Sequence, residues 1–175
     1  LPNEEWESLL REAKRRADEA GHYRYAFPKE FGGRDGTNLG MAIIREHFAT
    51  KGLGLHNDLQ NEHSIVGNNV GLLLMIEYGT EEQKAEWIDD LAKGNKGFAF
   101  GITEPAHGSD ATHMETNARR DGDEWIINGE KTWNTGIHKA QYDMVMARTS
   151  GKPGDGDGIT AFLTPMNSEG LKIEE

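Results

Sequence analysis

The sequence predicts an α+β fold, with an all-α helical bundle in residues 1–96 followed by an antiparallel β-sheet or partial barrel in residues 97–175. Three observations predict it. Apolar residues recur every three to four positions before Gly97, and they recur at alternate positions after it. No β-α-β alternation is visible and no GxGxxG motif follows a strand, which argues against a Rossmann nucleotide site.

Composition narrows the classes of partner. The formal net charge of −11 would repel phosphates, so we expect no nucleic acid and no anionic membrane surface as a partner. A single anionic ligand stays compatible with this charge, because a local group of backbone N–H donors can outweigh distant charges. The chain has no cysteine, which excludes disulfides, Cys-ligated zinc and thiol catalysis.

Hydropathy predicts no membrane span, because no apolar run approaches the ~18 residues that a span needs, and no signal peptide is visible. We therefore expect a cytoplasmic protein, or one of the mitochondrial matrix in a eukaryote. The chain starts at Leu1 without a methionine and stops at "LKIEE", so we also expect a piece of a longer protein.

The first predicted helix covers residues 3–20, with Asn3 as its N-cap and Gly21 at its end. Its apolar face consists of Trp6, Leu9, Leu10, Ala13, Ala17 and Ala20. Proline and glycines predict a loop in residues 28–38.

Three further helices are expected before Gly97. One begins near Asn38, and residues 64–79 are apolar enough to run through the middle of the bundle. The last begins after Thr80, which forms a capping box with Gln83. The side chains expected to face inward are Met41, Ile44 and Phe48 on the second helix and Ile88, Leu91 and Ala92 on the last.

The second half predicts strands at residues 98–102, 142–149 and 159–165. "DG" at Asp121–Gly122 and "NG" at Asn128–Gly129 each predict a hairpin turn. Residues 150–158, "SGKPGDGDG", predict a flexible loop between the last two strands.

Two motifs of the second half form a known combination: "TEPAHGSD" at the entry to the sheet, and "INGEKTWNTG" about 20 residues later. With "PKEFGG", "YGTEEQKAEWIDDLAKG" and "GITAFLTPMNSEGLKI", the chain resembles the acyl-CoA dehydrogenase family of flavoproteins. Proteins of this family have an N-terminal helical domain, a middle β domain and a C-terminal four-helix bundle. The resemblance implies that this chain covers the first domain and most of the second, with the C-terminal bundle absent.

The resemblance also implies an FAD site. The family positions that line the flavin edge and the pyrophosphate correspond to Thr103, the backbone of Phe100 and Ile102, and the turn at Gly108 and Ser109. Ser109 also corresponds to a serine that touches the acyl-CoA thioester portion. Trp133 corresponds to the tryptophan that packs on one face of the ring, and Thr135, with Asn134 between them, to the threonine near flavin N5.

The reaction implied is α,β-dehydrogenation of an acyl-CoA thioester with hydride transfer to flavin N5. The family's base is a glutamate that no residue of this sequence matches, so we expect it beyond Glu175 and assign no catalytic residue here. An electron-transfer flavoprotein or a similar acceptor is the implied partner, and a homo-oligomer, dimer or tetramer, is the implied assembly.

Taken one at a time, these residues have plainer interpretations. Trp133 alone indicates a buried tryptophan in a sheet core, and Thr103 and Thr135 alone are ordinary strand threonines. Glu104 and Asp110 are interpreted as loop carboxylates that cap turns. Only the joint pattern favours flavin.

The sequence departs from the family motif at three places, one of which is "GIH" at residues 136–138 where "NG" is more common. Ala106–His107 replaces a pair of small residues, and His107 is interpreted as a solvent-facing histidine. Asn134 stands where an aliphatic residue is usual. These departures bear on the substrate, not on the flavin.

Three alternatives to an acyl-CoA dehydrogenase are a metal site, another flavin-dependent enzyme and a non-catalytic binding protein. The spacings of His107 with His113, and of His56 with Asp58 and His63, fit no zinc motif, so no metal is expected. The same architecture hosts flavin-dependent acyl-CoA oxidases and two-component monooxygenases. A non-catalytic FAD- or CoA-binding remnant of the fold is the alternative from a different class.

Overall fold

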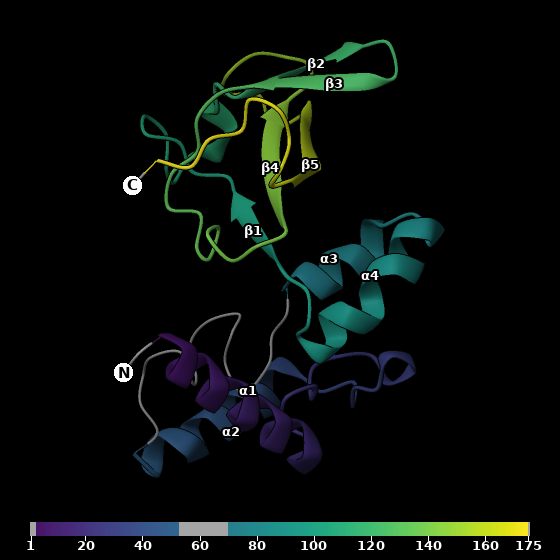
Figure 1. Cartoon of the computed structure of the whole chain (residues 1–175), viewed down its shortest axis with the longest axis vertical. Helices are drawn as coiled ribbons and strands as arrows, with labels where there is room; N and C mark the ends of the chain where they lie inside the picture. Colours follow the sequence, from purple (N-terminus) through teal and green to yellow (C-terminus); the bar gives the residue numbers. More distant parts are fainter. Residues whose placement is uncertain (1–2, 53–69, 175) are drawn as a thin grey trace. The chain divides into compact units, whose positions relative to one another are not determined.

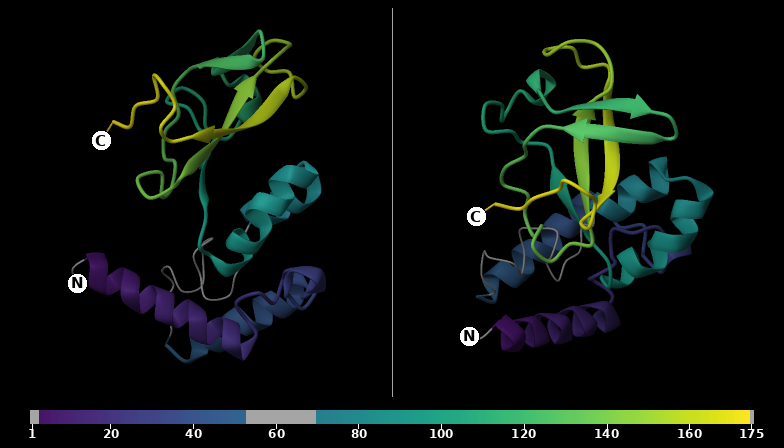
Figure 2. Two further views of the ribbon diagram at one scale, coloured as in Figure 1. Left: turned by 45° about the vertical axis from the view of Figure 1, so that its right-hand side comes forward. Right: turned by 45° about the horizontal axis from the view of Figure 1, so that its top comes forward.

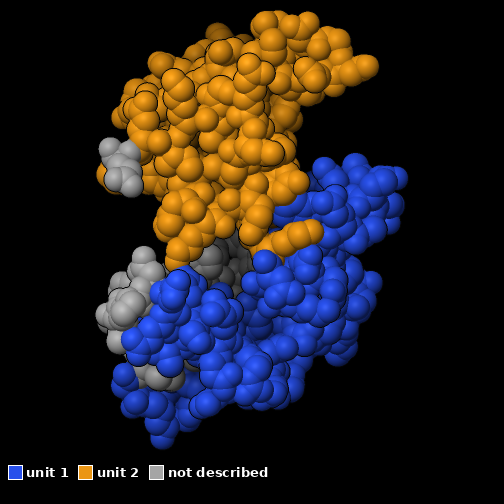
Figure 3. Space-filling view, viewed as in Figure 1, with its two compact units in different colours: residues 1–95 blue, residues 96–175 orange. Residues whose placement is uncertain are grey.

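The computed structural model describes residues 3–174 except 53–69, and the chain divides into two compact units, Leu1–Asn95 and Lys96–Glu175 (Figures 1 and 3). The first unit contains the helices α1 (Asn3–Ala20), η1 (Lys29–Phe31), α2 (Asn38–Thr50), α3 (Val70–Tyr78) and α4 (Glu81–Lys93). The second contains the strands β1 (Phe98–Gly101), β2 (Asn117–Asp121), β3 (Glu124–Asn128), β4 (Tyr142–Arg148) and β5 (Ile159–Pro165), with a short helix η2 (Ala111–His113). The α+β class is confirmed.

Local signals place the helices of the first unit. The side chain of Thr37 accepts a hydrogen bond from Gly40 N and starts α2. The predicted capping box starts α4: Thr80 Oγ1 accepts from Gln83 N, and the Gln83 side chain accepts from Thr80 N. Gly94, with a φ of 74°, ends α4 in the left-handed conformation that glycine adopts without strain.

The core of the first unit gathers on α3, α4 and the chain after α1. Its buried side chains are Ala17, Tyr23, Phe27, Met41, Leu72, Met75, Trp87, Ile88, Leu91 and Ala92. The predicted inner face of α1 is buried only in part, because Ala17 is inaccessible while Leu9 is 55% exposed. The first residues of the predicted third helix, 64–69, lie outside the described part of the chain, as do His56, Asp58 and His63. No helix in the described part is long and apolar enough to span a membrane.

Thr80→Ala is expected to lower the free energy of unfolding of the first unit by about 1 kcal/mol, because the substitution removes the N-cap of α4. Urea unfolding followed by circular dichroism measures the loss. Thr50→Ala is the control, because the Thr50 hydroxyl lies at the C-terminal end of α2, where it donates to His47 O and caps no helix N-terminus. Equal losses for the two variants would contradict the capping argument.

The sheet of the second unit is mixed, which corrects the antiparallel prediction. β4 pairs antiparallel with β5, and β2 pairs antiparallel with β3, but β1 and β2 both pair parallel with β4. Tight turns join only antiparallel neighbours, whereas β1 and β4 are connected by a long segment that contains η2 and the β2–β3 hairpin. That hairpin lies across β4 and β5 (Figures 1 and 2) and contacts β4 through the pair Asn117–Arg148.

One of the two predicted hairpin turns is confirmed and the other is wrong. Asp121 pairs with Glu124, so Gly122 and Asp123 form a two-residue turn as predicted. The chain makes no hairpin at Asn128–Gly129, because residues 129–141 run on without strand pairing to β4. A Cβ on Gly129 would lie 2.6 Å from Thr116 Cα, so this glycine serves a close approach of two backbones.

Candidate functional site

The segment Ile102–His113 leaves β1 through a tight turn over residues 104–107. Glu104 N donates to His107 O at 3.0 Å, and His107 N donates to Glu104 O at 3.1 Å. Pro105 sits in this turn, where its fixed φ favours the reversal. The segment then reaches Asp110, whose carboxylate accepts from Thr112 N and pairs with His113 Nδ1 at 2.9 Å. Asp110 therefore caps η2, as the sequence indicated.

Glu104 is a buried structural carboxylate. Its Oε2 accepts from Glu115 N at 2.7 Å, and its Oε1 accepts from Thr116 N and from Lys131 Nζ, both at 2.9 Å. The two paired side chains are 4% and 6% exposed. Burial by itself raises the pKa of Glu104, but the hydrogen bonds from Glu115, Lys131 and Thr116 outweigh it and lower the pKa to about 2. The ionised carboxylate thus holds the turn onto two other segments.

The second motif lies beside the first. Thr132 N donates to Thr103 O at 2.9 Å, and this bond joins segments that are about 30 residues apart in sequence. Trp133 follows in the left-handed conformation, with a φ of 61°, and its side chain is 86% exposed. The interpretation of Trp133 as a sheet-core residue is therefore wrong. Trp133 is instead exposed to solvent, directly after the residue that is bonded to Thr103.

The remaining predicted residues are divided between exposed and buried positions. Phe100 on β1 and Thr135 are exposed, whereas Ile102 and Thr103 are half-buried. The Asn134 side chain is turned away from solvent, and its Nδ2 donates to Asp143 Oδ2 at 2.7 Å. The structure therefore brings Thr103 and the Trp133 region together, while the Asn134 amide faces into the sheet.

Gly108 and Ser109 lie exposed in a bend after the turn. A Cβ on Gly108 would meet no atom of the described residues within 4 Å, and its φ is outside the left-handed region. The chain's own packing therefore does not require glycine at this position. The bend is exposed, with open space beside the Gly108 Cα.

The two histidines of the segment lie side by side. The His107 and His113 rings stack with their centroids 6.0 Å apart, and His107 Nε2 lies 3.4 Å from Glu115 Oε1. His107 is half-buried by these contacts and is not fully solvent-facing. Over the described residues, no group of three or more His, Asp or Glu side chains is arranged to hold a metal ion.

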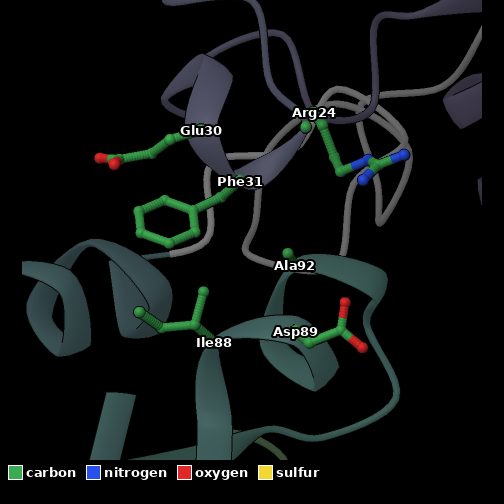
Figure 4. A pocket seen from close by; sticks show the side chains of 7 residues that line it. Arg24, Glu30, Phe31, Ile88, Asp89 and Ala92 are labelled. Carbon is green, nitrogen blue, oxygen red and sulfur yellow. The ribbon is translucent and has the colours of Figure 1, made fainter. Parts of the chain in front are cut away.

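A separate cavity of about 280 Å³ lies in the first unit, between η1 and α4 (Figure 4). Phe31 and Ile88 line it from these two elements, together with Arg24, Glu30, Gly32, Asp89 and Ala92. It contains none of the predicted cofactor residues, which all lie in the second unit.

Known proteins share both units of this chain. Residues 2–95 match the family model for the acyl-CoA dehydrogenase N-terminal domain, and residues 99–175 match the model for the middle domain. The chain belongs to the acyl-CoA dehydrogenase family.

Two relatives show the extent of the match. The mitochondrial short-chain specific acyl-CoA dehydrogenase of Homo sapiens is 34% identical over 146 residues, which cover 83% of this chain and 34% of that protein. The 3-(aryl)acrylate reductase of Clostridium sporogenes is 34% identical over 155 residues, covering 87% of this chain and 39% of the reductase. The chain thus spans between a third and two fifths of the length of these relatives.

Solved structures agree with this family fold. A glutaryl-CoA dehydrogenase from Mycobacterium smegmatis, in complex with FADH2, is 32% identical with a TM-score of 0.67, and the match covers 94% of this chain and 39% of that one. The ChsE4–ChsE5 complex from Mycobacterium tuberculosis gives 29% identity and a TM-score of 0.73, over 96% of this chain and 43% of that one.

Two side chains of this acyl-CoA dehydrogenase family chain were missed by the sequence analysis. Lys131 pairs with Glu104 and also donates to Ile102 O at 3.2 Å, and Asp143 accepts from Asn134. Neither residue stands in a pattern that indicates burial. Asn134 was the available signal, because a carboxamide in place of an aliphatic residue needs a polar partner when it is buried.

Proposed function

We propose that residues 97–175, as the middle β domain, form part of an FAD site in an enzyme that removes hydrogen from the α and β carbons of an acyl-CoA thioester. The observation that carries the proposal is Trp133. Trp133 is 86% exposed, and the residue before it, Thr132, is hydrogen-bonded through its backbone N–H to Thr103 O, so the tryptophan presents a broad apolar face to solvent beside this junction. A flat aromatic cofactor is the ligand that such a face fits.

The residues around Trp133 suit the other parts of the cofactor. Thr103 and Thr135 offer hydroxyl groups, and the backbone of Phe100 and Ile102 offers peptide groups, for the polar edge of the ring. The open bend at Gly108 and Ser109 lets backbone N–H groups approach a phosphate, and Ser109 is also the proposed contact to acyl-CoA. Asn134 would contribute through its backbone, since its amide is bonded to Asp143. When bound, FAD supplies the electron-accepting ring for the dehydrogenation.

The proposed function also implies an electron acceptor, an assembly, a catalytic base and a cellular compartment. An electron-transfer flavoprotein or similar acceptor would take the electrons, and a homodimer or homotetramer would be the working assembly. The base would be a glutamate beyond Glu175, and the compartment would be the cytoplasm, or the mitochondrial matrix in a eukaryote. On this view residues 1–175 do not turn over alone, so clean reduction of bound flavin by acyl-CoA in the 175-residue chain would contradict it.

Gly108→Val is expected to weaken FAD binding at least about tenfold, because the branched side chain would stand where the cofactor approaches the backbone. The melting temperature should stay within a few degrees, since no atom in the part of the chain that the structure describes lies near a Cβ at this position. Flavin fluorescence titration and thermal unfolding measure the two quantities.

Gly156→Val is the matched control, because Gly156 is equally open and has an ordinary φ but lies in the loop before β5. It should leave FAD binding unchanged. Equal affinity for FAD in Gly108→Val and Gly156→Val would show that the Gly108 bend does not contact the cofactor. A colourless protein that takes up no FAD would instead favour the non-catalytic alternative.

A further inference from the structure

We propose that Asp143 is a positioning residue: through its hydrogen bond to Asn134 it sets the place of the tryptophan segment (residues 132–135) on the sheet. Its consequence for the cofactor rests on the proposed function, whereas the positioning itself does not.

The contact is short and buried. Asn134 Nδ2 donates to Asp143 Oδ2 at 2.7 Å, and Asp143, on β4, is 3% exposed. Gly101 on β1 makes room for the pair, because a Cβ there would lie 2.8 Å from Asn134 Nδ2 and 2.9 Å from Asp143 Oδ2. Three separate stretches of chain are thus fitted around one hydrogen bond.

This bond is one of two that bracket Trp133. On one side Thr132 N donates to Thr103 O, and on the other the Asn134 side chain is tied to Asp143. Trp133 between them has a φ of 61°, a conformation that a non-glycine residue keeps only where its surroundings enforce it. With the Asn134 bond removed, the Thr132 bond and the Lys131 anchor would still hold the segment before Trp133, but the tie of the segment after it to β4 would be lost.

The chemistry of the pair also accounts for the amide at position 134. In the part of the chain that the structure describes, Asn134 Oδ1 and Asp143 Oδ1 are buried without a hydrogen-bond partner. Burial raises the pKa of Asp143, and the Asn134 bond and the Lys131 charge oppose this. An aliphatic residue at 134 would remove the hydrogen-bond donor of Asp143. The unusual asparagine at 134 is therefore explained by the buried aspartate at 143.

The test compares Asp143→Ala with two other variants in protein labelled with 5-fluorotryptophan. The chain has four tryptophans, and Trp133→Phe assigns the Trp133 signal in the 19F NMR spectrum. Asp143→Ala is expected to shift or broaden this signal and to weaken FAD binding at least about tenfold. In Asp143→Asn the side-chain oxygen can still accept a hydrogen bond from Asn134. The Trp133 signal and the affinity for FAD should therefore stay near the wild-type values.

Val145→Ala is the control for a loss of stability alone. Val145 is buried on the same face of β4, two residues along the strand, and its truncation should lower the melting temperature without moving the Trp133 signal. If Asp143→Ala does not fold, Asn134→Ala removes the same bond from its other partner and replaces Asp143→Ala in the comparison.

The outcomes separate the two proposals. An unmoved Trp133 signal in Asp143→Ala, or an equal shift in Val145→Ala, overturns the positioning role. A shift in Asp143→Asn as large as in Asp143→Ala also overturns it, because the bond would then not be the cause. If the wild-type chain binds no FAD but only the bond-breaking variants move the signal, the positioning role stands and the proposed function fails.

Discussion

Glu104→Gln is expected to lower the free energy of unfolding of the second unit by about 3–5 kcal/mol, since breaking a buried ion pair leaves the other charge uncompensated. The charge left behind is that of Lys131, whose Nζ lies 2.9 Å from Glu104 Oε1 with its side chain 6% exposed. The substitution also places an amide N–H₂ group against a site built from three donors. Removing both charges in Glu104→Gln/Lys131→Met should cost less than the single change.

Urea unfolding followed by tryptophan fluorescence measures this loss. Replacing Trp6 and Trp87 by phenylalanine leaves Trp125 and Trp133 as reporters, both of which lie in the second unit. Asp110→Asn is the control, because this carboxylate belongs to the same loop but its side chain is 63% exposed. A loss for Glu104→Gln no larger than that of Asp110→Asn would contradict the structural role of the pair.

The same carboxylate predicts a dependence on pH. Its pKa falls from an ordinary 4.5 to about 2 on folding, so its contribution to stability is complete above pH 4.5 and is lost as the pH falls toward 2. The wild-type protein should therefore lose stability in this acid range, and Glu104→Gln should lose less over the same range. Melting temperatures at a series of pH values check the difference. Parallel curves for the two proteins would contradict it.

The helical half was predictable because its signals are local. The Asn3 N-cap, the Gly21 end signal and the capping box at Thr80 act within a few residues, and α1 begins and ends, and α4 begins, close to where these signals place them. The exposure of Leu9 was not predictable, because helix periodicity shows which face is apolar and not how much of that face the rest of the chain covers.

Local sequence signals do not predict how the strands of the sheet pair. "DG" at residue 121 makes a hairpin, but "NG" at residue 128 does not, because Gly129 is needed for a close approach to Thr116. The parallel pairing of β1 with β4 depends on a crossover of about 40 residues, which no short pattern encodes. The order of strands along the chain was therefore predictable, while the directions of their pairing were not.

The residues of the candidate site also fall into two groups: those that a sequence motif marks and those that no motif marks. Motifs predict Thr103 and Trp133 as site residues, and a backbone hydrogen bond from Thr132 to Thr103 places their segments side by side. Lys131 and Asp143 were not found, because each gains its role from one partner that is distant in sequence, Glu104 in one case and the Asn134 segment in the other. Buried polar partners are set by three-dimensional contacts, so a motif can mark one member of a pair and leave the other unmarked.

Arg148 holds a loop that the sequence predicted to be flexible. The residue is 7% exposed, and its guanidinium donates to the carbonyl oxygens of Ser150, Asp155, Asp157 and, on η2, Thr112. The loop of residues 150–158 is thus tied both to the end of β4 and to the segment that follows Ser109.

Arg148→Met is expected to lower the free energy of unfolding of the second unit by about 3 kcal/mol or more, because hydrogen bonds from a charged donor contribute about 1.5–3 kcal/mol each and the bonds from the guanidinium to four carbonyl groups are lost. Arg148→Lys should recover only part of this, since a single ammonium cannot reproduce the planar fork of donors. Urea unfolding gives the free energies.

Hydrogen exchange gives the local effect. Gly154 N donates to Thr112 O, so the Gly154 amide reports directly on the tie between the loop and η2. Arg119→Met is the control: Arg119 is 62% exposed and pairs with Asp121 on the surface, so its loss should stay within about 0.5 kcal/mol and leave the Gly154 amide protected. If the Gly154 amide exchanges at the same rate in Arg148→Met and Arg119→Met, the guanidinium does not order this loop, and the glycine-rich sequence determines its mobility after all.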